Sequence, residues 1–159
     1  WSMNQNRRLL LRGTLAAGAV GVGLGAGLLS PRRVLAAAWP KDAFEAKKIE
    51  AAVGALLGSA ATETSGAISI KAPDIAENGA VVPITVTTEL KGVESISLLI
   101  AENAAPLAAS FQFAASADPT ASTRLKMGKT SDVVAVVRAG GKLYSARKGV
   151  KVTIGGCGG

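Results

Sequence analysis

The chain has 159 residues, with 18 Lys and Arg, 11 Asp and Glu, and no histidine. A formal charge of +7 would suit nucleic acid or an anionic membrane surface, but five of the arginines lie in the first 38 residues, which contain no acid. From Trp39 onward, 13 basic and 11 acidic residues leave a net charge of only +2. We therefore do not expect nucleic acid as a partner.

The N-terminal segment has the three parts of a secretory signal. A basic stretch at 6–13 precedes an uncharged apolar stretch at 13–29, and alanines at 36–38 offer the small-residue site that a signal peptidase cleaves. The apolar stretch has 17 residues and six glycines, so it is short for a membrane-spanning helix. This pattern predicts a cleaved signal peptide, with an uncleaved signal anchor as the alternative.

The signal peptide has the features of export by the twin-arginine (Tat) pathway. Arg7 and Arg8 are adjacent, and a leucine pair and Arg12 follow them, which resembles the Tat consensus. We expect residues 1–38 to be a Tat signal peptide cleaved after Ala38. The mature protein is then expected in the periplasm without contact to the membrane.

The mature chain begins with a segment that predicts a helix over 42–58. Asp42 and Glu45 have the spacing of a capping box, and Gly58 suits the C-terminal cap. Apolar residues recur at helical spacing, at Ile49, Val53, Leu56 and Leu57.

After residue 66 the apolar period changes to two, which is typical of strands. The candidate strands lie at 68–71, 82–86, 96–100, 107–113, 133–137, 142–146 and 150–154. Short strands at this spacing predict a mainly β fold, an immunoglobulin-like antiparallel β-sandwich preceded by an N-terminal α-helix. We expect one domain over 39–154.

Two details of the sandwich can be anticipated. Pro83 lacks the N–H that a ladder needs, so its strand is expected at an edge or with a bulge. Alanine supplies much of the apolar content, which predicts a narrow core with an apolar face that a second subunit covers.

The composition gives little support to catalysis. Without histidine there is no Ser–His or Cys–His pair to activate a nucleophile, and no metal-ligand spacing is present. We expect no cofactor, no catalytic residue, no metal site and no enzymatic activity of the chain's own. Arg124, Lys126 and Lys129 form a basic cluster that suits either an anionic partner or a solvated face.

The C-terminal tail carries the only cysteine of the chain. Cys157 lies between the pairs Gly155–Gly156 and Gly158–Gly159. Glycines have no side chain to pack, so 155–159 is predicted to be a flexible swinging arm that presents the thiol to other proteins. The alternative is a structural sandwich that is cross-linked through an intermolecular disulfide at Cys157.

The leader, the β-rich domain and the terminal sequence VTIGGCGG over 152–159 together resemble the SoxY family, the sulfur carrier subunits of the Sox thiosulfate-oxidation system. The stretch 68–86 is also similar to the family's first strands. The resemblance implies that Cys157 carries thiosulfate-derived groups covalently. It implies that Gly155, Gly156, Gly158 and Gly159 let this cysteine enter the active sites of separate enzymes.

The resemblance also implies a set of partners. They are a SoxZ-like β-sandwich subunit in a heterodimer, a c-type cytochrome that joins thiosulfate to the cysteine, and a dimanganese hydrolase that releases sulfate. A molybdenum sulfane dehydrogenase, where present, oxidises the remaining sulfur.

Overall fold

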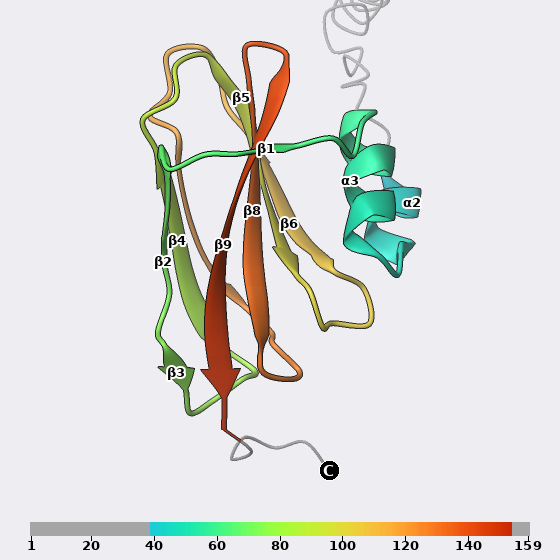
Figure 1. Ribbon diagram of the computed structural model, residues 1–159, viewed down its shortest axis with the longest axis vertical. Helices are drawn as coiled ribbons and strands as arrows, with labels where there is room; N and C mark the ends of the chain where they lie inside the picture. Colours follow the sequence, from blue (N-terminus) through green and yellow to red (C-terminus); the bar gives the residue numbers. More distant parts are fainter. Residues whose placement is uncertain (1–38, 154–159) are drawn as a thin grey trace, which may run out of the picture. The chain divides into compact units, whose positions relative to one another are not determined.

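The computed structural model describes residues 39–153, which include two helices and the strands that follow them (Figure 1). Within the described residues, no helix is long and apolar enough to cross a membrane. The helices are α2 (Lys41–Glu45) and α3 (Ile49–Leu57), and the strands are β1 (Glu63–Thr64), β2 (Ile68–Lys71), β3 (Ile75–Ala76), β4 (Val82–Thr88), β5 (Val93–Ile100), β6 (Leu107–Gln112), β7 (Thr120–Leu125), β8 (Ser131–Ala139) and β9 (Lys142–Val152).

The helical segment differs from the single helix expected over 42–58, because it is broken between α2 and α3. The capping-box prediction is wrong. Pro40 occupies the N-cap of α2 without a side-chain cap, so Asp42 lies inside the first turn, and Glu45 pairs with Lys41 at 3.7 Å. Gly58 does cap α3, with a φ of 79° and its N–H donating to the Gly54 carbonyl.

The strands form two sheets. The larger has the order β1-β9-β8-β5-β6, with β3 also paired to β9, and the smaller has the order β2-β4-β7. Every pairing between the longer strands is antiparallel, and the two-residue strands β1 and β3 pair parallel to β9. In Figure 1 the helices, the larger sheet and the smaller sheet form three successive layers. The prediction of a mainly β sandwich preceded by a helix is confirmed.

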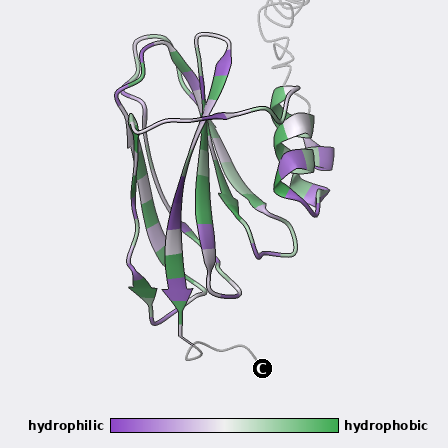
Figure 2. Ribbon diagram, viewed as in Figure 1, coloured by the Kyte–Doolittle hydropathy of each residue, from purple (hydrophilic) through white to green (hydrophobic). Residues whose placement is uncertain are grey.

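The core has two parts, one on each face of the larger sheet. Along β8, Val133, Ala135 and Val137 belong to the cluster between the two sheets, while Val134 and Val136 belong to the cluster beneath the helices. Figure 2 shows the corresponding alternation of apolar and polar residues along β4 and β9. The chain's own helices therefore cover one face of the larger sheet. The large apolar side chains exposed in the described part of the chain are Trp39, Ile75 and Val81.

Two strand predictions also need correction. The strand with Pro83 is the central strand of the smaller sheet rather than an edge. Because β2 ends at Lys71 opposite Thr85, β4 has only β7 as a neighbour at Pro83, so the missing N–H is tolerated there. The segments 142–146 and 150–154 are parts of one strand, β9, which ends at Val152.

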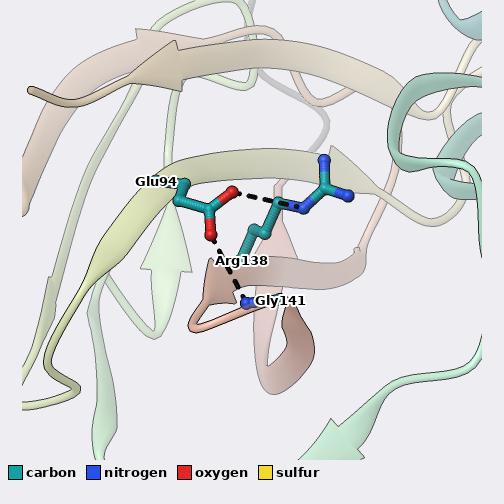
Figure 3. A network of polar contacts seen from close by, with 3 residues as sticks. All are labelled: Glu94, Arg138 and Gly141. Atoms are coloured by element: carbon teal, nitrogen blue, oxygen red, sulfur yellow. Dashed lines mark hydrogen bonds and ion pairs between the residues drawn. The ribbon is translucent and has the colours of Figure 1, made fainter.

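The hairpin that joins β8 to β9 is braced by Glu94. Gly140 and Gly141 form the turn with φ values of 56° and 75°, as the Gly-Gly sequence predicts. Glu94 lies at an irregularity of β5 between Val93 and Ser95. Its carboxylate accepts from the Gly141 N–H at 3.4 Å and lies 3.5 Å from Nε of Arg138 (Figure 3). The turn before β9 is thereby tied to β5, the strand on the far side of β8.

Candidate functional site

The candidate site lies where β9 ends and the glycine tail follows. At this point the backbone of Val152 is held by the side chain of Thr130. The Val152 N–H donates to Thr130 Oγ1 at 3.0 Å, and the same hydroxyl donates to the Val152 carbonyl at 3.4 Å. One threonine therefore satisfies both backbone groups of the last residue in the strand.

Strand β3 holds the same end of β9 from the other side. Ile75 and Ala76 pair with Lys151 and Val152, and the Ala76 carbonyl accepts from the Thr153 N–H at 3.1 Å. The backbone at the end of β9 therefore has hydrogen bonds on both of its sides, to Thr130 and to β3, up to Thr153, the last residue that the structure describes.

A buried glycine, Gly79, also contacts the end of β9. The contacts of Thr130, β3 and Gly79 with the end of β9 are called the anchor below. The Gly79 carbonyl accepts from the Met127 N–H at 2.7 Å, and the Met127 side chain is buried. A Cβ placed on Gly79 would lie 2.5 Å from the Met127 carbonyl oxygen and 2.7 Å from Cγ1 of Val152. The contact is therefore possible only without a side chain at position 79.

The residues of the basic cluster expected from the sequence lie on β7 and on the loop that follows it. Lys126 and Lys129 are exposed on the loop that carries Met127, next to the end of β9. Arg124 is exposed on β7, where it pairs with Pro83. Two of the three residues therefore lie on the loop that contacts the end of β9, and the third lies on the smaller sheet.

A cleft of about 640 Å³ opens beside the last residues of β9. Three carboxylates and one ammonium group line it, and the nearby Lys148 lies 3.2 Å from one of them, Asp74. Ser131, one of the lining residues, accepts from the Glu102 N–H at 3.0 Å through its hydroxyl. The lining residues are Asp74, Ala101, Glu102, Thr130, Ser131, Asp132, Gly149, Val150 and Lys151.

The described part of the chain contains no group of three or more His, Cys, Asp or Glu side chains that could hold a metal ion. Cys157 and its flanking glycines Gly155, Gly156, Gly158 and Gly159 lie outside the described residues, as do Arg7, Arg8 and Ala38. The sequence did not identify Thr130 or β3 as part of the site. Their contacts with β9 bring together residues far apart in the chain, and no local pattern signals such contacts.

Comparison with known proteins places these features in a family. The model of the family described as sulfur oxidation protein SoxY matches residues 53–157. The solved structure of the sulfur carrier protein SoxY from Chlorobium limicola f thiosulfatophilum is 48% identical, with a TM-score of 0.62, over 67% of this chain and 97% of that chain. A superoxide reductase (neelaredoxin) from Ignicoccus hospitalis has 20% identity and a TM-score of 0.50 over 58% of this chain and 82% of that one, which is a likeness of fold alone. No match was found among the curated proteins.

Proposed function

The chain belongs to the SoxY family of sulfur oxidation proteins, and we propose that it is a periplasmic sulfur carrier that binds thiosulfate-derived groups covalently on Cys157. The observation that carries the proposal is the extent of the family match, which runs through the whole described sandwich and reaches Cys157. The solved relative, a sulfur carrier protein, supports the same role. The chain itself is a substrate carrier, and the enzymes are its partners.

The geometry at the end of β9 supports a mobile carrier on a fixed base. The backbone is anchored up to Thr153 by Thr130 and Ala76. Cys157 is four residue steps beyond Thr153, and such a chain spans at most about 14 Å when it is extended. The thiol can therefore reach into another protein while the sandwich remains at its surface.

The proposed reactions consume water and need an electron acceptor, and we propose that the partner enzymes provide both. Loading joins the cysteine sulfur to the outer sulfur of thiosulfate, which releases one proton and two electrons to a c-type cytochrome and leaves a cysteine thiosulfonate. Hydrolysis by a dimanganese enzyme adds water, releases sulfate and one proton, and leaves a persulfide, Cys–S–SH, on Cys157. A sulfane dehydrogenase would oxidise the outer sulfur of that persulfide. A SoxZ-like subunit would form a heterodimer with the carrier. The heterodimer would be exported by the Tat pathway, and the signal peptide would be cleaved after Ala38.

Intact-mass measurement of protein purified from thiosulfate-grown cells tests the proposal. We expect adducts that carry sulfane or thiosulfonate groups and that disappear in Cys157→Ser. The same substitution should leave the midpoint of thermal unfolding unchanged. Unmodified chains joined only as a reducible dimer would instead establish the cross-linked structural protein and refute the carrier.

A further inference from the structure

The last residues of β9 are held differently from the rest of the strand. The backbone register between β8 and β9 ends with Ser131 opposite Val150. In the described part of the chain, β9 has no partner residue in β8 from Lys151 onward. On that side the side chain of Thr130, the residue just before β8, takes the place of a strand.

The Thr130 hydroxyl imitates the backbone of a strand residue. In an antiparallel ladder, a residue accepts from the N–H and donates to the C=O of the residue opposite. Thr130 Oγ1 does both toward Val152, at 3.0 Å for the N–H and 3.4 Å for the carbonyl. Both bonds involve one oxygen atom, so rotation about a single side-chain torsion, χ1, breaks them together. Thr130 is exposed, so no packing blocks this rotation.

The opposite side of the same three residues is held by a short strand. The Lys151 N–H donates to the Asp74 carbonyl at 2.9 Å. The N–H and the hydroxyl of Thr153 donate to the Ala76 carbonyl at 3.1 Å and 3.5 Å. β3, which supplies Ala76, has two residues, and β9 is its only partner among the described strands. Because the Val152 side chain is only half-buried, the end of β9 can detach locally while the β8–β9 pairs remain formed.

We infer that Thr130 is a positioning residue for Cys157: its hydroxyl fixes the point at which the tail leaves the sandwich, and its release lets residues 151–153 join the tail. The inference rests on the proposed function for the role of Cys157. With the hydroxyl bound, the tail starts at Thr153, and the four residue steps to Cys157 span at most about 14 Å. With the hydroxyl turned away, the last paired residue is Val150. The seven steps from there span at most about 25 Å, so the thiol reaches about 11 Å farther.

A tail of two lengths suits a carrier that is passed between proteins. A tail that starts at Thr153 confines the thiol to a smaller volume, which raises its effective concentration at a site close to the sandwich surface. A tail that starts at Val150 reaches a deeper site, at the cost of ordering three more residues there. One carrier can therefore serve sites at two depths.

Hydrogen exchange of the mature chain tests whether Thr130 controls this release. Thr130→Val keeps the shape of the side chain and removes both hydrogen bonds to Val152. We expect the Lys151 and Thr153 amides to exchange at least about tenfold faster, the effect of one lost hydrogen bond, although their own acceptors are carbonyls of other residues. Amides in the centre of β8 should exchange at the wild-type rate. Thr130→Ser keeps the hydroxyl, and its exchange rates should stay within about twofold of the wild type.

Thr85→Val is the matched control for the loss of a threonine hydroxyl. Thr85 Oγ1 is hydrogen-bonded to Ser122 Oγ at 2.9 Å in the smaller sheet, so its removal should leave exchange at Lys151 and Thr153 unchanged. Thr130→Ala is a second variant in case the valine crowds the loop. Wild-type exchange rates at Lys151 and Thr153 in a folded Thr130→Val or Thr130→Ala would overturn the inference.

A second cysteine measures the reach of the thiol. Ser145 of β9 lies eight residues before Thr153, about 26 Å away along the strand, and a disulfide needs Cα atoms within about 7 Å. A tail of about 14 Å from Thr153 falls short of this position, whereas a tail of about 25 Å from Val150, which is about 17 Å away, reaches it. In a glutathione buffer, the intramolecular disulfide between Cys157 and Ser145→Cys should therefore form at least about tenfold faster in Thr130→Val than with Thr130 present. Equal rates would show that Thr130 does not set the length of the tail.

These measurements separate the inference from the proposed function, because both use protein without bound sulfur. If Cys157 is loaded with sulfur in cells but Thr130→Val changes neither exchange nor disulfide formation, the carrier function stands and the inference fails. If Thr130→Val accelerates both but Cys157 never carries sulfur, the carrier function fails while the control of tail length by Thr130 is established.

Discussion

Gly79→Ala is a direct test of the packing that anchors the end of β9. The added methyl group would lie 2.5 Å from the Met127 carbonyl oxygen and 2.7 Å from Cγ1 of Val152. The Val152 side chain can rotate or shift, but the Met127 oxygen belongs to the backbone. Met127 is also held by its own hydrogen bond to the Gly79 carbonyl at 2.7 Å. Relief of the clash therefore requires the backbone at Met127 to move away from residue 79.

The expected loss follows from the cost of overpacking, which is about 1–3 kcal/mol of unfolding free energy. In a domain of this size the loss corresponds to a fall of roughly 4–12 °C in the unfolding midpoint. The effect should be largest at the anchor, because Thr130 holds Val152 through both of its backbone groups. We expect hydrogen exchange at Val152 to accelerate more than exchange in the centre of β8.

Urea unfolding followed by circular dichroism measures the change, and Gly54→Ala is its matched control. Gly54 lies inside α3 with open space around its Cα, so alanine there should stabilise the protein by about 0.5–1 kcal/mol. An unfolding free energy of Gly79→Ala equal to that of the wild type would show that the loop moves aside without cost. The account of a rigid anchor would then be wrong.

Three more substitutions test other parts of the molecule. Leu99→Ala, at a fully buried position beneath the helices, should cost about 2–5 kcal/mol in urea unfolding, and a loss below 1 kcal/mol would contradict a packed helix layer. Glu94→Gln keeps an acceptor for the Gly141 N–H and removes only a half-exposed ion pair with Arg138, so its unfolding free energy should fall by less than about 1 kcal/mol at low salt and not at all at high salt. Gly156→Trp should slow the transfer of sulfur to partner enzymes in stopped-flow assays while the thiol reacts with small disulfide reagents at the wild-type rate, and equal rates in both assays would argue against entry of the tail into narrow sites.

The sequence predicts those parts of the fold that have a strong local signal. Gly58 ends a helix because only a residue that tolerates positive φ suits that cap, and Gly140-Gly141 forms a hairpin turn for the same reason. The alternation of β4 and the apolar run of β8 likewise appear as strands. These features depend on neighbouring residues alone.

The features that local patterns missed depend on distant contacts. β1 and β3 have two residues each, too few to show a period, and they exist through parallel pairing with β9. The Arg147-Lys148-Gly149 stretch looks like a break between two strands, yet pairing with β8 keeps it in β9. Asp42 has the sequence signature of a cap, but Pro40 begins the helix two residues earlier. At the candidate site, the terminal motif could be recognised, whereas the anchor by Thr130 could not.

The length of β9 has a mechanical consequence. Nine residue pairs join β8 to β9 in antiparallel register, and they continue without a break from the hairpin turn to Val150. An enzyme that grips the tail and draws it along the axis of β9 therefore loads these pairs in shear, all at once, instead of peeling them apart one by one. The sheet therefore resists traction along the axis of β9 as a unit.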